Sequence, residues 1–161
     1  HVESWQSTYA GILLDEVSLN LDFAQYEARW WRHVLGRFRR NHFVYVAESP
    51  DGGVVGFASA GPSRNSELTY RAEIYTIYLG DDYHGGGIGR QLFASAVAGA
   101  QEVRGPSAIV WCLSQNPSRF FYERLGGKLE ARRPGRVGGA IIEEFGYAWK
   151  DASELAVWGS A

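Results

Sequence analysis

Residues 78–92 read YLGDDYHGGGIGRQL, a glycine-rich turn set between a strand-like run and a helical pattern. The apolar run that begins at Ile74 ends at Leu79, and four glycines follow within five residues. Glycine tolerates positive φ and carries no side chain, so the backbone of such a turn can approach a ligand closely. The first N–H groups of the following helix lack intrahelical acceptors and carry the positive end of its dipole. The stretch therefore predicts a phosphate site at the mouth of a helix.

The composition is that of an ordinary globular protein. The chain has 161 residues, of which 45% are hydrophobic and 21% charged, and its formal net charge is −2. Such a balance argues against disorder and gives no basic field for nucleic acid or anionic lipid. The one cysteine, Cys112, excludes an internal disulfide and fits a reducing compartment. No run approaches the roughly 20 apolar residues of a membrane span and no signal-peptide pattern opens the chain, so we expect a cytoplasmic protein without nucleic-acid or membrane partners.

The hydrophobic periodicity predicts one mixed α/β domain over residues 1–161. Antiparallel hairpins lead into a central strand–helix–strand unit, in the order α-α-β-β-β-α-β-α-β-β. The end of the chain, residues 150–161, has weak signals and is expected to be a loose tail or a homodimer contact. Helices are expected over 1–9, 21–40, 87–103 and 116–125, and strands over 43–48, 54–60, 68–79, 107–113, 128–133 and 141–149, with a glycine-rich connection over 134–139.

Three kinds of glycine turn compete for this stretch. A P-loop has Lys and then Ser or Thr directly after its last glycine, whereas Arg90 and Gln91 follow Gly89. A dinucleotide-binding turn opens a parallel βαβ series and has an acidic residue about 20 residues on, but Glu102 is nearer and hairpins come first. A purely structural turn stays open as an interpretation, although each glycine costs roughly 0.5–1 kcal/mol relative to Ala.

Two motifs of the chain resemble those of the GNAT superfamily of N-acetyltransferases. The run Glu73–Leu79, followed by Tyr83–Arg90, is similar to its acyl-CoA-binding motif, Gln/Arg-x-x-Gly-x-Gly/Ala. The segment Asn116–Gly126 is similar to its second motif, in which Phe-Tyr-Glu-x-Leu-Gly follows an Asn. The order and spacing of the two motifs also agree with the family, and the resemblance extends over about residues 43–150.

The resemblance implies a GNAT-like acyl-CoA N-acyltransferase fold, whose first strand would precede His1 and is absent from this sequence. It also implies direct transfer of an acetyl group from acetyl-CoA to a primary amine of a small molecule or a peptide, with no acyl-enzyme and no metal. A non-catalytic acyl-CoA-binding or regulatory domain of the same fold is the alternative function. A structural glycine-rich domain is a third.

The coenzyme site that the resemblance implies rests mainly on backbone groups. His84 stands where the family has Gln or Arg, so an imidazole that is mostly neutral at pH 7 replaces the usual donor. Backbone N–H groups of the turn would hold the pyrophosphate, and strand backbone would hold the pantetheine arm. The implied coenzyme-binding residues are Ile77, Tyr78, Leu79, His84, Gly85, Gly86, Gly87, Ile88, Gly89, Arg90, Asn116 and Arg124.

Two residues match the positions of the family's acid and base. Glu73 is the expected base, acting through ordered water because Ile77 lies four residues on, roughly 13 Å at about 3.3 Å per residue. A carboxylate in an apolar strand needs a polar partner, so a salt bridge is the alternative role. Tyr122 is the expected acid because a phenol is protonated at neutral pH, with a packed aromatic as the alternative. Cys112 lies in an apolar run without a neighbouring His and is not expected to be a nucleophile.

The acceptor is the part of the reaction about which the sequence says least. Aromatic side chains of the two opening helices, Trp5, Tyr9 and Trp30 among them, would suit a small amine with an apolar body or a peptide N-terminus. A place in the core is an equal alternative for them. In a regular strand Tyr75 and Ile77 would share the face of Glu73, which makes Tyr75 a further candidate for contact with the acceptor.

Overall fold

The computed structural model describes residues 41–137 and 140–156, which form six strands, three α-helices and one 3-10 helix. The helices expected over 1–9 and 21–40, with Trp5, Tyr9 and Trp30, lie outside the described residues. In chain order the described elements are β1 (Phe43–Glu48), β2 (Val54–Pro62), β3 (Ala72–Leu79), η1 (Asp81–Tyr83), α4 (Ile88–Arg104), β4 (Ala108–Leu113), α5 (Arg119–Arg124), β5 (Lys128–Val137), β6 (Ala140–Trp149) and α6 (Ser153–Ala156).

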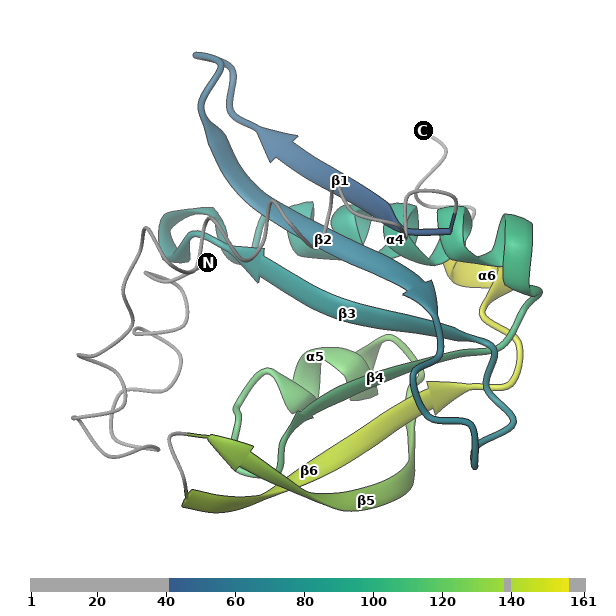
Figure 1. Ribbon diagram of the computed structural model, residues 1–161. Helices are drawn as coiled ribbons and strands as arrows, with labels where there is room; N and C mark the ends of the chain where they lie inside the picture. Colours follow the sequence, from purple (N-terminus) through teal and green to yellow (C-terminus); the bar gives the residue numbers. More distant parts are fainter. Residues whose placement is uncertain (1–40, 138–139, 157–161) are drawn as a thin grey trace.

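The strands form one mixed sheet in the order β1-β2-β3-β4-β6-β5. The central pair β3–β4 is parallel and the other described pairs are antiparallel, which confirms the expected mixed α/β architecture. Parallel neighbours need a crossover connection, and α4 supplies it. Figure 1 shows α4 and α5 behind the sheet. We call the opposite side, which is nearer the viewer in that figure, the front face.

The main hydrophobic core lies between the sheet and the helices. Phe93 of α4 is fully buried, and its ring centroid lies 5.9 Å from those of Phe121 and Tyr122 and 5.2 Å from that of Trp149. α4 forms because its apolar residues recur at helical spacing and face the sheet. Gly105, with φ +85°, ends it by donating its N–H to the carbonyl of Gln101.

The hairpin β2–β3 is shifted relative to the expected boundaries. β2 continues through Pro62, which pairs with Ala72, whereas residues 68–71 form no strand. Apolar side chains at Leu68 and Tyr70 suggested a strand there, but they pack instead against Ile109 in a small second cluster. The apolar pattern alone does not distinguish a strand from a loop that folds back on the sheet.

Two C-terminal elements also differ from the expected boundaries. β5 runs through the expected glycine-rich connection as far as Val137, and it tolerates Pro134 because it is an edge strand. α5 comprises only Arg119–Arg124, because the side chain of Asn116 accepts the N–H of Ser118 and holds a turn ahead of the helix.

The first part of the expected loose tail is packed. Ala152 and Leu155 are 1% and 6% exposed and belong to the main core, and α6 contacts α4. The N–H of Ala152 donates to the carbonyl of Pro106 at 2.9 Å. Residues 151–156 therefore differ from the expectation, while residues 157–161 lie outside the described part. None of the described helices combines the length and the apolar character needed to cross a bilayer.

A β-bulge at Tyr75 changes which side chains of β3 face the core. Ala60 of β2 pairs with Ile74 and the preceding Ser59 pairs with Thr76, so Tyr75 is an extra residue. Ile74 and Ile77 consequently both pack against the core on the helix side of the sheet. The expectation that Ile77 shares a face with Glu73 is wrong, because the bulge shifts the alternation by one residue.

Candidate active site

β3 and β4 separate after a short paired stretch. Their parallel pairing ends at Ile74 and Val110, although β3 continues to Leu79 and β4 to Leu113. Figure 1 shows the two strands diverging towards the end of the molecule at which α4 begins. Within the described sheet, the edge of β3 that faces β4 has no strand partner beyond Ile74, since its other edge pairs with β2. Such an edge offers backbone donors and acceptors to an extended ligand.

The glycine turn borders open space at the start of α4. Gly85 and Gly87 have φ of +81° and +85°, conformations that side chains rarely adopt. A Cβ built at Gly85, Gly86 or Gly87 would meet no atom within 4 Å. The first helical hydrogen bond runs from Gln91 N–H to the carbonyl of Gly87 at 3.1 Å, so the amides before Gln91 belong to the turn that lacks intrahelical acceptors. These features are those expected of a turn that binds an anion.

The ring of His84 lies against the end of β3. Its Nε2 is 3.0 Å from the carbonyl oxygen of Leu79, which can only accept, so Nε2 carries the hydrogen. In the neutral ring Nδ1 is then an acceptor, which offers nothing to a phosphate. The turn therefore offers its backbone N–H groups to an anion, as the sequence predicts.

α5 brings the second motif next to the glycine turn. A Cβ added at Gly89 would lie 3.8 Å from both Leu79 Cδ2 and Phe121 Cε2, so the end of β3, the start of α4 and α5 meet at this point. The neighbouring Tyr122 is 6% exposed, and its ring centroid lies 6.1 Å from that of Tyr147 in β6. The structure thus joins motifs that are some thirty residues apart in the chain.

Three of the expected coenzyme residues are not among those that line the meeting point of β3, the glycine turn and α5. Asn116 is buried, and its Oδ1 accepts the N–H of Ser118 at 2.8 Å, which gives it a structural role ahead of α5. Arg90 and Arg124 are exposed in the first turn of α4 and the last turn of α5. The separated part of β3 contains Ile77, Tyr78 and Leu79, and of these Leu79 lies next to the turn at Gly89.

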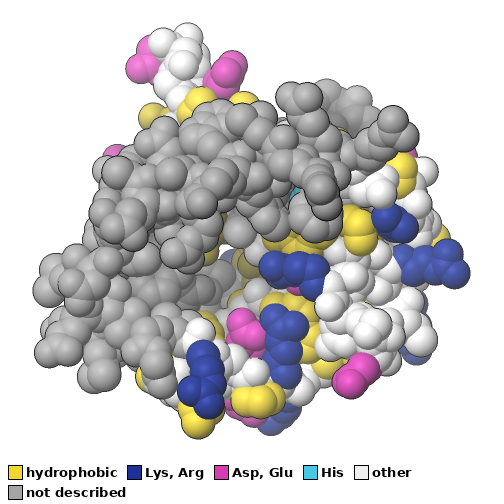
Figure 2. Space-filling model, viewed as in Figure 1, with side chains coloured by type: hydrophobic (Ala, Val, Ile, Leu, Met, Phe, Trp, Pro, Cys, Tyr) yellow, Lys and Arg dark blue, Asp and Glu magenta, His cyan; other side chains and the backbone are white. Residues whose placement is uncertain are grey.

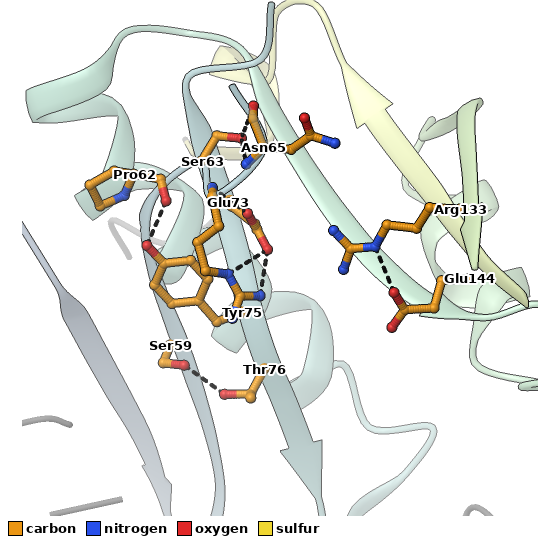
Figure 3. Close-up of polar contacts among 10 residues, drawn as sticks. Ser59, Pro62, Ser63, Asn65, Glu73, Tyr75, Thr76, Arg133 and Glu144 are labelled. Atoms are coloured by element: carbon orange, nitrogen blue, oxygen red, sulfur yellow. Dashed lines mark hydrogen bonds and ion pairs between the residues drawn. The ribbon is translucent and has the colours of Figure 1, made fainter. Parts of the chain in front are cut away.

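Glu73 is held by Arg64, in the loop between β2 and β3. The Glu73 side chain is fully buried; its Oε1 accepts hydrogen bonds from Nε and Nη2 of Arg64, the Nε bond being 2.9 Å long. Its Oε2 accepts the backbone N–H of Arg64 at 2.8 Å. Figure 3 shows this carboxylate beside Tyr75 on β3. The salt bridge that the sequence left open is therefore present, and it leaves no surface of this carboxylate exposed to solvent.

Tyr75 packs beside this ion pair on the front face. Its hydroxyl donates to the carbonyl of Pro62 at 2.6 Å, and the guanidinium of Arg64 lies 4.4 Å from the centre of its ring. Burial, and secondarily the charge of Glu73, raises the pKa of Tyr75 to about 12. Tyr75 consequently stays protonated at neutral pH and orients its neighbours.

A model of the Acetyltransferase (GNAT) family matches residues 5–127, well over half of the chain. The chain belongs to the GNAT family. The N-acetyltransferase YuaI of Bacillus subtilis strain 168 is 33% identical over 155 residues, which cover 96% of this chain and 86% of that protein.

Solved structures of GNAT proteins share the fold. A GNAT acetyltransferase from Desulfovibrio desulfuricans has a TM-score of 0.63 at 21% identity, with 94% of this chain and 90% of that chain covered. The PaiA N-acetyltransferase of Thermoplasma acidophilum, solved with coenzyme A, has a TM-score of 0.57 at 23% identity, with 89% and 86% covered. Family and fold make this GNAT chain an acetyl-CoA-dependent N-acetyltransferase.

Several polar residues of this GNAT site were not expected from the sequence. Arg64 lies nine residues before its partner Glu73, and only the shape of the intervening loop brings them together. Arg133 and Glu144 form a second ion pair, across β5 and β6. The register of that hairpin could have revealed the pair, had residues 134–137 been interpreted as strand.

Cys112 is a buried structural thiol in this GNAT chain. It is 6% exposed in the core, and burial raises its pKa to about 12. A thiol that keeps its proton is a poor nucleophile. This agrees with direct transfer, in which no acyl-cysteine forms.

The raised pKa of Cys112 predicts a loss of stability in alkali. The unfolded thiol loses its proton above about pH 8.5, whereas the folded thiol keeps it until about pH 12. The stability that the raised pKa of Cys112 contributes is fully present below about pH 8.5. Above that pH the free energy of unfolding should fall by up to about 1.4 kcal/mol per pH unit. Urea unfolding between pH 7 and about pH 10 measures this, and Cys112→Ala should flatten the decline. An equal decline in both proteins would contradict the prediction.

Proposed function

We propose that this chain moves an acetyl group from acetyl-CoA directly to a primary amine of a small molecule or a peptide. The observation that carries the proposal is the meeting of the separated edge of β3, the glycine turn and α5 at one place. The edge suits an extended pantetheine arm, and the turn suits the pyrophosphate that follows it. The coenzyme A bound to the similar PaiA structure supports this choice of coenzyme.

Backbone groups carry most of the coenzyme binding in this proposal. Those of β3 from Ile77 to Leu79 hydrogen-bond the arm and the thioester carbonyl. The amides of residues 85–89 hold the pyrophosphate, while Arg90 and Arg124 supply exposed positive charge near it. His84 holds the end of β3 and thereby fixes the approach to the turn.

The transfer needs a base and an acid, and in this proposal they lie on opposite faces of the sheet. The amine nitrogen attacks the thioester carbon, the C–S bond breaks, and coenzyme A leaves as a thiolate. Glu73, on the front face, takes the proton of the acceptor ammonium through ordered water that enters with the bound substrates. Tyr122, on the helix side, gives its proton to the leaving sulfur, and the second N–H proton, released as the amide forms, passes through water and restores the Tyr122 phenol. The acceptor therefore approaches from the front face.

Release of free thiol from acetyl-CoA, followed over a panel of amines, tests the proposed function. Turnover that depends on an amine is expected, together with a thermal shift on adding coenzyme A. A shift without turnover for any amine would favour the non-catalytic acyl-CoA-binding alternative. The absence of both would contradict a coenzyme A site altogether.

Glu73→Gln tests the base. Gln keeps the shape and can still accept from Arg64, but it cannot take up a proton, so kcat should fall by about 10²–10⁴-fold at pH 7. The Kd of acetyl-CoA should stay within about twofold, because β3 backbone and the turn bind it. Glu143→Gln is the control: this side chain on the same sheet is 52% exposed and should leave kcat unchanged. A loss of stability without a loss of kcat would show that Glu73 is only structural.

A further inference from the structure

Two arginines lie on the front face, one on each side of the point at which β3 and β4 separate. Glu73, the partner of Arg64, is in register with Ile109 of β4. Trp111, two residues on, shares the side of Ile109 and is the first residue of β4 beyond the paired stretch. Arg133 of β5 covers the Trp111 ring, with its guanidinium carbon 3.9 Å from the ring centre. Figure 3 shows Arg133 pointing from its strand towards Glu73.

Arg133 is held rigidly but keeps most of its donors. Its Nε donates to Oε2 of Glu144 at 2.6 Å, and its side chain is 35% exposed. Within residues 41–137 and 140–156, neither of its two terminal nitrogens makes a hydrogen bond. A guanidinium has five N–H donors, and the fork formed by its terminal nitrogens matches the two oxygens of a carboxylate. Stacking on Trp111 and the bond to Glu144 fix the plane of this fork in advance.

Arg64 differs because its donors are mostly used. Its Nε and Nη2 both bind Glu73, which leaves Nη1 as its one terminal nitrogen without a bond among the described residues. Its side chain is 58% exposed, so it adds a donor at the rim of the front face. Arg133 is therefore the better anchor for a ligand.

The charges of this region suit a ligand with both signs. Arg64 and Arg133 are each paired with a carboxylate, Glu73 and Glu144, so these four side chains together carry no net charge. A phosphate dianion would be repelled by the two carboxylates, whereas an amine that also carries a carboxylate would not.

We propose that the acceptor amine is a small amino acid, whose carboxylate binds the terminal nitrogens of Arg133. This inference rests on the proposed acetyltransferase function. Its ammonium then lies towards Glu73, which removes the proton before transfer. The bidentate contact selects acids over uncharged analogues of the same size.

Matched acceptors test this specificity. Thiol release is measured for amino acids and for their carboxamides, with amines that lack a carboxylate and short peptides in the same panel. The free acids should exceed their carboxamides by at least about tenfold in kcat/KM. Equal or better turnover of the carboxamides, or turnover of only the simple amines or peptides, overturns the carboxylate site and leaves the acetyltransferase function intact. No turnover anywhere contradicts both.

Variants in one strand separate specificity from stability. Arg133→Lys keeps the positive charge but loses the fork, so the ratio of acid to carboxamide turnover should fall towards one, through a raised KM of the acid. Arg132→Lys is the matched control, because Arg132 stacks on Phe145 on the helix side of the sheet and is 61% exposed. A ratio that survives in Arg133→Lys, or that falls equally in Arg132→Lys, overturns the assignment of Arg133.

Discussion

Gly87→Trp is expected to raise the Kd of acetyl-CoA by more than about 100-fold. No atom lies within 4 Å of a Cβ at this position, so the indole would occupy the open space in which we place the pyrophosphate. It would displace at least two hydrogen bonds to a charged group, each contributing about 1.5–3 kcal/mol, and about 1.4 kcal/mol is tenfold in Kd. Isothermal titration calorimetry with acetyl-CoA measures the change.

Gly52→Trp is a matched control for this substitution. Gly52 has φ +87° and nothing within 4 Å of its Cβ, so the backbone strain and the free space equal those at Gly87. It lies in the β1–β2 turn, at the far tip of the hairpin in Figure 1. Both variants should lose about 1–2 kcal/mol of stability from strain, but only Gly87→Trp should lose coenzyme affinity. Equal affinities of the two variants would show that the turn is purely structural.

Tyr122→Phe is expected to lower kcat by about 10²–10⁴-fold while the Kd of acetyl-CoA stays the same. The variant keeps the ring that packs against Phe93 and Phe121, at 5.9 and 5.5 Å between centroids, so the core is preserved. The substitution removes the proton that Tyr122 would give to the leaving thiolate. Steady-state thiol release and coenzyme titration together measure the two quantities.

Tyr147→Phe is the control for a buried phenol in the same cluster. Its hydroxyl donates to Glu123 at 2.7 Å, and burial together with that carboxylate raises its pKa to about 12. Removing it should cost about 1 kcal/mol of stability and leave kcat within a few-fold. If both variants lose kcat equally, packing of the cluster and not proton donation explains the effect. An unchanged kcat in Tyr122→Phe would exclude the acid role.

Figure 2 shows the front face, from which we propose that the acceptor approaches. On this face basic, acidic and hydrophobic side chains lie side by side, whereas the opposite side of the sheet is covered by α4 and α5. The charged residues that we use on it, Arg64, Glu73, Arg133 and Glu144, form two ion pairs. The expected contacts of Trp5, Tyr9 and Trp30 with the acceptor stay predictions, since these residues lie outside the described part.

Much of the fold could be predicted because its signals are local. β1 was expected with the bounds it has, and α4 and β4 within one residue, since periodicity and flanking glycines mark them directly. The expected ends of β2 and β5 are wrong because pairing with a neighbouring strand decides where each strand ends. β2 extends to Pro62 only because Ala72 lies opposite, and β5 extends to Val137 only because β6 does.

The sequence by itself determined the family, the order of the strands and helices from residue 43 to residue 149, and the two family motifs. A turn that binds phosphate through backbone amides needs glycines at consecutive positions, and such a requirement is legible in the chain. Only the tertiary structure decided which side chains lie on the front face and which of them contact one another. Strand register and loop shape determine three features of this face: the bulge at Tyr75, the ion pair of Arg64 with Glu73, and the stacking of Arg133 on Trp111. Register and loop shape arise from contacts between residues far apart in the chain. For this reason the glycine turn could be predicted before the structure was known, and the candidate acceptor site could not.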